Sequence, residues 1–331
     1  MTNLFVSLLS ALLATNQPAA GTNSPRKPAI TAEPAVNTND PVGIEYQKLL
    51  DADDSSQEAV DKLIRDEGAA AAQGASTTVG PLRDRIEARF APVRQGYEDF
   101  LKRHPDHARA RLAYGSFLND IKDEEGAREQ WEKARQLDPK NPAAWNNLAN
   151  YYGHNGTIFK AFDYYAKAIE LNPAEPIYYH NFAITVYLFR KDAKEHFRIN
   201  EQQVFDKAMG LYARALMLNP QDFLLASDVA QTFYGITPLR TNDALLAWNY
   251  ALQIARDDVE REGVFIHFAR VKGMAGRFDE ARRHLAAVTN AMYADLKNRV
   301  LRNLEYKESE AKGTNGPPAK VEKDSNLGPA P

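Results

Sequence analysis

Small and large apolar residues recur together along the chain at a fixed interval. Two alanines flanking an aromatic residue, followed by a proline, occur twice with a spacing of 34 residues: Ala127, Trp131, Ala134 and Pro139, then Ala161, Tyr165, Ala168 and Pro173. Steps of three and four residues place these side chains on one face of a helix, and the proline ends that helix. A repeat of this length indicates helical hairpins that bury their apolar faces by stacking. The pattern predicts an all-α solenoid.

The first helix of each hairpin keeps the same interval, and the whole repeat resembles the tetratricopeptide repeat. Residues 142–175 match that family's pattern at eight positions: Trp145, Leu148, Ala149, Tyr152, Ala161, Tyr165, Ala168 and Pro173. Residues 108–141 match at seven: Tyr114, Gly115, Leu118, Ala127, Trp131, Ala134 and Pro139. The resemblance covers residues 88–290. It implies a right-handed helical-hairpin solenoid of about five repeats with helical caps, which binds protein or an extended peptide in its concave groove.

The third repeat is longer than its neighbours. Tyr179 and Phe182 begin it in register, but Ala208 and Tyr212 come 47 residues after their counterparts, so thirteen extra residues lie within 187–207. Insertions in repeat arrays project from one face and often carry specific contacts. A lengthened hairpin with a solvated tip is equally compatible with this sequence.

Residues 42–87 and 291–306 flank the array as expected helical caps. In the N-terminal cap, Tyr46–Leu50 and Ala59–Ile64 suggest two helices, with Ser55 or Ser56 starting the second. The last 25 residues, 307–331, contain no aromatic residue and one leucine. We expect them to form a disordered tail, because they cannot bury enough apolar surface to offset the entropy of ordering.

The N-terminus has the pattern of an export signal. Leu4–Ala14 is an apolar run of 11 residues, too short to span a bilayer as a helix. A polar, proline-rich linker at residues 21–41 follows, and cleavage after Ala14 or near Ala19 and Ala20 fits this arrangement. We therefore expect residues 1–20 to direct export to the periplasm or the outside. The alternative is a cytoplasmic protein with a disordered start and a chance apolar run.

The composition limits which partners and which kinds of site the chain can have. The 331 residues carry a formal charge of −3, which gives no indication of a nucleic-acid partner. Cysteine is absent, which excludes disulfides, thiolate catalysis and cysteine zinc sites. No second apolar segment has spanning length, so we expect no integral membrane segment. The oligomeric state is left open.

No catalytic or metal-binding motif stands out. His104 and His107 lie around the turn at Pro105 without a carboxylate motif, and no phosphate-binding loop or zinc motif occurs. We expect a non-catalytic protein without cofactor or metal. Two alternatives stay open: an enzyme or enzyme subunit with a site built from His180, His267 and Asp228, and a structural protein that self-assembles through its repeat ends.

Specificity is expected on one stripe of the first helices. Positions five, nine and twelve of each repeat share a face, and asparagine at position six recurs 34 residues apart in Asn147 and Asn181. An asparagine side chain can donate to and accept from a peptide backbone. The groove candidates are Asn146, Asn147, Asn150, His180, Asn181, Ser227, Asp228, Gln231 and Arg270. The alternative for the asparagines is local capping or solvation within the stack.

Some family members grip a C-terminal carboxylate with basic residues beside two asparagines. Asn150 and Asn181 match those asparagines in the resemblance. The basic positions, however, hold Asn146, Leu224 and Asp228. The sequence therefore does not support a carboxylate clamp at these positions.

Overall fold

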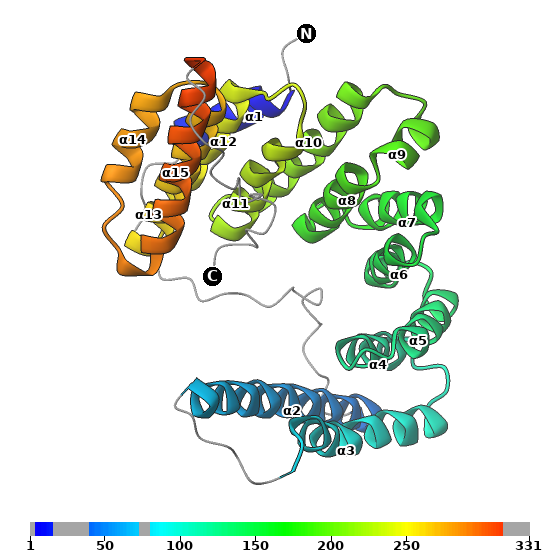
Figure 1. Cartoon of the computed structure of the whole chain (residues 1–331). Coiled ribbons are helices and arrows are strands. Elements are labelled where there is room, and N and C mark those ends of the chain that lie inside the picture. The colour runs from blue at the N-terminus through cyan, green and yellow to red at the C-terminus, as the bar shows by residue number, and fades with distance from the viewer. Residues whose placement is uncertain (1–3, 16–39, 73–79, 314–331) are drawn as a thin grey trace. The chain divides into compact units, whose positions relative to one another are not determined.

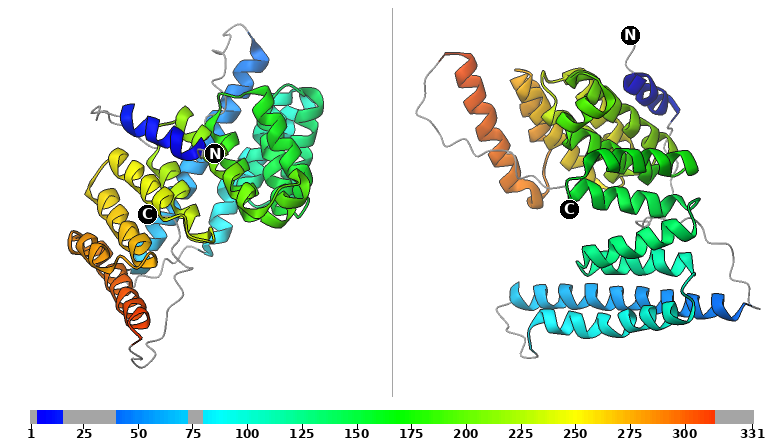
Figure 2. Two further views of the ribbon diagram at one scale, coloured as in Figure 1. Left: turned by 90° about the horizontal axis from the view of Figure 1, so that it is seen from above. Right: turned by 90° about the vertical axis from the view of Figure 1, so that its right-hand side faces the viewer.

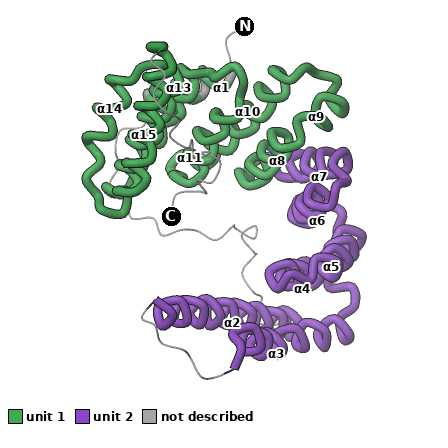
Figure 3. The backbone as a smooth tube through the Cα atoms, viewed as in Figure 1, with its two compact units in different colours: residues 1–24, 174–331 green, residues 25–173 purple. Residues whose placement is uncertain are grey.

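A computed structural model describes residues 4–15, 40–72 and 80–313 (Figure 1). Within these ranges the chain is built from helices and contains no β-strand, which confirms the all-α class. Two compact units divide the chain: residues 25–173 form one, and residues 1–24 with 174–331 form the other (Figure 3).

Three pairs of packed helices make up the described part of residues 25–173. In chain order these are α2 (Pro41–Ala72) with α3 (Leu82–Arg103), α4 (Ala108–Asp120) with α5 (Glu124–Leu137), and α6 (Pro142–His154) with α7 (Ile158–Leu171). The last two pairs are the two repeats that the sequence pattern defines best.

The other unit contains the later repeats and the C-terminal cap. Its helices are α1 (Leu4–Thr15), α8 (Pro176–Leu188), α9 (Arg190–Phe197), α10 (Glu201–Leu218), α11 (Phe223–Thr232), α12 (Thr241–Ile254), α13 (Asp258–Met274), α14 (Phe278–Ala286) and α15 (Ala294–Ala311). Short 3₁₀ turns follow α11 (η1, Phe233–Gly235) and α14 (η2, Ala291–Tyr293). The packed pairs here are α8 with α10, α11 with α12, and α13 with α14. With α4–α5 and α6–α7 they make the five hairpins that the repeat pattern predicts in the described residues, and α2 with α3 is a sixth pair before them.

Helix ends follow from local sequence. The prolines at positions 139, 173 and 220 lie two residues beyond the ends of α5, α7 and α10. Side-chain oxygens cap several starts: Oδ1 of Asp123 accepts from the backbone N–H of Gly126 at 3.1 Å, and Oδ1 of Asp222 accepts from that of Leu225 at 3.0 Å. Each hairpin is therefore delimited by its own residues.

Small residues let the helices of one hairpin approach closely. Gly115 on α4 faces Trp131 on α5, and a Cβ at this glycine would lie 2.5 Å from the indole ring. Trp131 is buried, and among the described residues no group accepts a hydrogen bond from its Nε1. In the next hairpin Ala149 and Tyr165 occupy the same two repeat positions, and both are buried. Of these two hairpins, the one with the larger residue at position eight thus has the smaller aromatic residue at position twenty-four. The fourth repeat differs, because it holds Ala230 with Trp248.

The N-terminal cap contains one helix where the sequence suggests two. Residues 41–72 form the single helix α2 because its serines do not interrupt it. The Ser55 hydroxyl donates to the backbone carbonyl of Asp51 inside the helix, and that of Ser56 donates to the backbone carbonyl of Arg89 on α3. The expected helix start at these serines is therefore wrong.

The insertion in the third repeat forms a short helix and an added turn. Helix α9 follows α8 and ends where Arg198 adopts a left-handed conformation, with φ of 54°. Asn200 and Gln203 then form a reciprocal capping box that starts α10. Helix α10 begins seven residues before Ala208, whereas α7 begins three residues before the equivalent Ala161. After the insertion, Ala208 therefore takes the same place in its hairpin as Ala161 does in the preceding one.

The C-terminal cap is held by a buried carboxylate. Glu262 on α13 accepts hydrogen bonds from the backbone N–H groups of Thr289 at 2.8 Å and Asn290 at 2.7 Å, and from the Thr289 hydroxyl at 2.9 Å. The following helix α15 continues to Ala311, five residues beyond the expected cap boundary at residue 306. The remainder of the expected tail, residues 314–331, lies outside the described residues.

The apolar run at the N-terminus forms α1, which packs against α10 and α12 (Figure 2, dark blue). The Phe5 and Leu9 side chains are fully buried, and the Phe5 ring lies 5.6 Å from the Phe233 ring. Residues 1–3 and 16–20 of the expected signal, and residues 21–39 of the expected disordered linker, lie outside the described residues. Across the described ranges, no helix combines the length and apolar character needed to cross a membrane.

The Gly115–Trp131 contact makes a testable prediction. Gly115→Ala should lower the free energy of unfolding by about 1–3 kcal/mol, because the methyl group overpacks the site. Adding Trp131→Tyr copies the Ala149–Tyr165 pair and should recover most of this loss in urea unfolding.

Gly210 on α10 is the control, since a Cβ there would meet nothing within 4 Å. Gly210→Ala should raise stability by about 0.5–1 kcal/mol. A double variant no more stable than Gly115→Ala alone would contradict the proposed exchange between the two positions.

A second prediction concerns Glu262. The backbone N–H of Asn290, opposed by burial and assisted by Thr289, lowers the pKa of Glu262. At pH 7, Glu262→Gln should cost about 1–3 kcal/mol. Both N–H groups donate to one carboxylate oxygen, and a neutral amide oxygen accepts them more weakly than a charged one. The amide nitrogen also cannot accept from the Thr289 hydroxyl.

The effect should depend on pH in a defined direction. Because the folded pKa lies below the unfolded value of about 4.3, the carboxylate stabilises the fold above that pH, and the contribution is lost as pH falls through the folded pKa. The stability gap between wild type and Glu262→Gln should therefore shrink between pH 5 and pH 2. The same substitution at exposed Glu305 is the control, and a gap independent of pH would refute this role.

Candidate functional site

The asparagines of α6 are held within their own unit. Asn146 is buried, and its amide nitrogen lies 3.3 Å from Oδ1 of Asn147. Nδ2 of Asn147 lies 3.5 Å from the Ser116 hydroxyl on α4. Oδ1 of Asn150 accepts a 2.6 Å hydrogen bond from the Tyr165 hydroxyl on α7. Each of these contacts is with another side chain of the same unit, and the groove role of the three asparagines stays a prediction.

In the other unit, the predicted residues of α8 and α11 meet. Nε2 of His180 lies 3.5 Å from Oδ2 of Asp228, and the His180 ring lies 5.8 Å from that of Tyr212 on α10. The Asp228 side chain is 40% exposed, so this carboxylate remains open to solvent and to a ligand. Two helices from successive repeats thus bring together an imidazole and a carboxylate.

The remaining candidates lie on α8, α11 and α13. Ser227 is buried, and no described group bonds its hydroxyl. Gln231 is half-buried, one turn beyond Ser227 along α11. The backbone carbonyl of Asn181 accepts from the Thr185 hydroxyl within α8. Arg270 lies over the Tyr234 ring, with its guanidinium carbon 4.4 Å from the centroid.

His267 belongs to a separate aromatic cluster. Its ring stacks on Trp248 at 4.0 Å, and its Nδ1 lies 2.9 Å from the Tyr234 hydroxyl. Burial, with a smaller effect of Arg270, lowers the pKa of His267 to about 3. This imidazole is therefore neutral near pH 7.

A cavity of about 300 Å³ lies between η1, α13 and α15. Its lining includes Arg270 and Lys307 beside the apolar side chains of Met274 and Leu304, and contains no acidic residue. Within the described residues, no group of three or more histidine or acidic side chains has the arrangement of a metal site.

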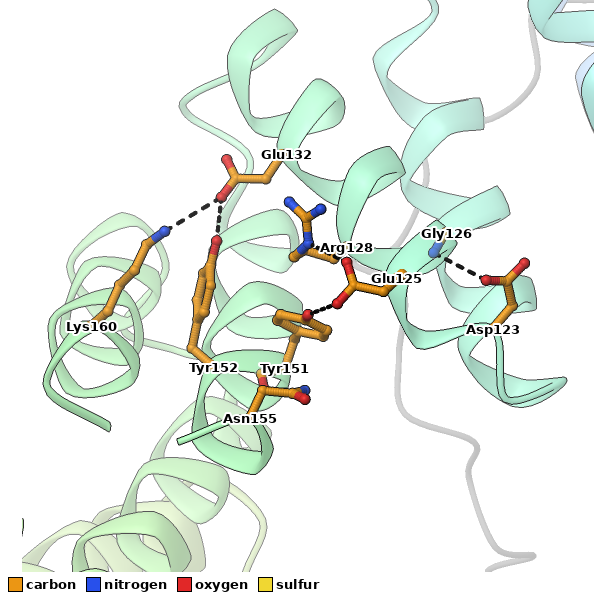
Figure 4. A network of polar contacts seen from close by, with 9 residues as sticks. All are labelled: Asp123, Glu125, Gly126, Arg128, Glu132, Tyr151, Tyr152, Asn155 and Lys160. Atoms are coloured by element: carbon orange, nitrogen blue, oxygen red, sulfur yellow. Dashed lines mark hydrogen bonds and ion pairs between the residues drawn. The ribbon is translucent and has the colours of Figure 1, made fainter. Parts of the chain in front are cut away.

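A polar network that the sequence pattern did not predict joins α5, α6 and α7 (Figure 4). Glu132 accepts from the Tyr152 hydroxyl at 2.7 Å and pairs with Lys160 at 3.7 Å. Burial opposes the charge, but hydrogen bonds from Tyr152 and Arg135 lower the pKa of Glu132. Lys160 also lies 3.7 Å above the Tyr152 ring. The sequence does contain a signal for this network. Tyr152 occupies position eleven of its repeat, and the charged Glu132 lies on the preceding helix.

Comparisons with known proteins agree with this architecture. Residues 72–144 match the family described as "TmcB, TPR repeats". A TPR repeat-containing protein of Methanocaldococcus jannaschii is 26% identical over 140 residues, 42% of this chain. Photosystem I assembly protein Ycf3 of Rippkaea orientalis is 29% identical over 83 residues, 25% of this chain. These matches span 21% and 48% of the two relatives, respectively.

Two solved structures show a similar arrangement of helices. The type IV pilus biogenesis factor PilW is 17% identical with a TM-score of 0.49, over 68% of this chain and 93% of its own. YrrB, described as a TPR protein with an unusual peptide-binding site, is 14% identical with a TM-score of 0.44, over 66% and 97%. With the repeat residues buried in successive hairpins and the family match at residues 72–144, the chain contains tetratricopeptide repeats.

Proposed function

We propose that this protein is a non-catalytic scaffold that binds an extended polypeptide along the first helices of its later repeats. The observation that carries the proposal is a row of polar side chains on α8, α11 and α13. His180 lies beside Asp228, Gln231 follows on the same helix, and Arg270 lies over Tyr234. We call these four residues, His180, Asp228, Gln231 and Arg270, the polar row.

The polar row suits a peptide backbone. A carboxylate accepts from peptide N–H groups, a guanidinium donates to carbonyls, and the amide of Gln231 does both. Contacts with His180 and Tyr234 restrict Asp228 and Arg270 before any ligand arrives. Such preorganisation reduces the entropy lost on binding.

The enzyme alternative has less support. It requires His180, His267 and Asp228 to act together, yet His267 contacts Trp248 and Tyr234 while His180 contacts Asp228. A general acid or base works best with a pKa near the working pH, and burial holds that of His267 far below neutrality.

The inserted helix α9 is the second candidate for recognition. Lys191 and Lys194 are exposed on it, beside the largely exposed side chain of Leu188. A partner that binds this insertion would depend on the two lysines, and its affinity would not depend on the polar row.

Binding can be tested with peptides selected from a random 12-residue display library on the purified full chain. Asp228→Ala combined with Gln231→Ala should weaken the selected peptides about 5- to 150-fold, since each lost hydrogen bond contributes about 0.5–1.5 kcal/mol. Fluorescence anisotropy would measure the affinities.

The matched control replaces exposed side chains of the same kinds, Gln253→Ala on α12 with Glu305→Ala on α15. Control affinities should equal wild type. If the polar-row variant binds normally while Lys191→Glu with Lys194→Glu does not, α9 is the recognition element and the proposal fails.

Export is a separate proposal, supported by the apolar run Leu4–Ala14 and the proline-rich segment that follows. The mature chain should then begin between Thr15 and Asn23. Mass spectrometry of the protein from its native host would determine its first residue. A cytosolic protein that retains Met1 or begins at Thr2 would refute export.

A further inference from the structure

Side chains of very different size occupy equivalent positions at two junctions between neighbouring repeats. In α5, α6 and α7, large polar and aromatic side chains occupy the space where the three helices meet: Glu132, Arg135, Trp145, Tyr152 and Tyr164. At the same repeat positions, α10, α11, η1 and α12 carry Ala213, Leu216, Ala226, Phe233 and Ala247. Three of these five replacements are alanine, so the later repeat has much less side-chain volume to fill the same space.

The later positions are nevertheless buried. None of the five side chains, Ala213, Leu216, Ala226, Phe233 and Ala247, is more than 2% exposed. Helix α1 packs on α10 and α12, and Phe5 reaches Phe233. We call the surface formed by these five residues the α10–α12 cleft.

Helix α1 presents two different sides. Phe5 and Leu9, four residues apart and therefore on one face, are fully buried, whereas Ser7 and Ser10 are exposed. An aromatic and a leucine side chain thus supply apolar volume in a region where the repeat's own residues are small. Without α1, this region would expose a contiguous apolar surface of the kind that marks interaction sites.

We propose that the α10–α12 cleft is a binding site for an apolar helix with an aromatic residue and a leucine four positions apart. Helix α1 occupies it within the chain, and a partner helix of the same pattern occupies it when α1 leaves. The two sites use different sides of α11. Ala226 and Phe233, seven residues apart, share one side, whereas Asp228 and Gln231 of the polar row each lie two residues from them and point the other way. In a chain that loses residues 1–20 on export, the cleft is open to the partner.

The test uses the full-length chain and a fluorescent peptide with the sequence of residues 4–15, made soluble by added lysines. Phe5→Asp with Leu9→Asp should release α1. Because tethered α1 competes at a high effective concentration, this variant should bind the peptide at least tenfold more tightly than wild type. Ser7→Asp with Ser10→Asp adds the same charges to the exposed side and should behave as wild type.

A second variant locates the site. Ala247→Tyr restores the tyrosine that the earlier repeat carries at Tyr164, and should fill the cleft. Added to Phe5→Asp with Leu9→Asp, it should abolish peptide binding, with an unchanged helical circular dichroism spectrum. The polar-row variant Asp228→Ala with Gln231→Ala should leave this peptide's affinity unchanged, which separates this proposal from the proposed function.

Three results would overturn the proposal. Equal affinity of wild type and the released variant would show that α1 does not compete for the site. Peptide binding that survives Ala247→Tyr would place the site elsewhere. A wild-type dimer that forms with rising concentration and is lost in Phe5→Asp with Leu9→Asp would make a second copy of the chain the occupant.

Discussion

The close approach of two helices within each hairpin is the constraint on which the rest of this structure depends. It needs a glycine or alanine on both helices, and all ten such residues are buried: Gly115 with Ala127, Ala149 with Ala161, Ala183 with Ala208, Ala230 with Ala244, and Ala269 with Ala281. At Gly115 even a methyl group would overlap the Trp131 ring. Because the backbones come so close, the next aromatic side chain can cover the hairpin, and the polar positions of the first helices keep a regular spacing.

That constraint explains what the sequence can predict. The small residues recur in every repeat, and the aromatic residue of the second helix recurs in the first four, so the five hairpins and the position of the insertion follow from the period alone. Chain segments without the period are harder to predict. Ser55 and Ser56 could start a helix, but their hydroxyls bond to backbone carbonyls, and this acceptor can be identified only in the folded chain.

The polar candidates show the same limit. Their positions on the first helices follow from the spacing, but their partners do not. Asn150 bonds the Tyr165 hydroxyl, and His180 meets Asp228, which lies 48 positions further along the chain. A tyrosine at a core position is a usable signal, since a buried hydroxyl requires a partner. The approach of His180 to Asp228 depends on how α8 and α11 pack, which the spacing of neither helix reveals.

The repeats share one backbone arrangement, but side chains of different size fill the space between their helices. This difference also explains why one repeat can bind what its neighbour cannot. Where Glu132, Tyr152 and Lys160 fill the space between helices, ionic and aromatic contacts close it from within. Where alanines stand at equivalent positions, the backbone spacing is still set by the small residues of each hairpin, so the helices do not collapse to fill the gap. Only an added side chain can occupy that volume, and Phe5 provides one. A repeat therefore gains a binding surface through the loss of large side chains, without any change in its fold.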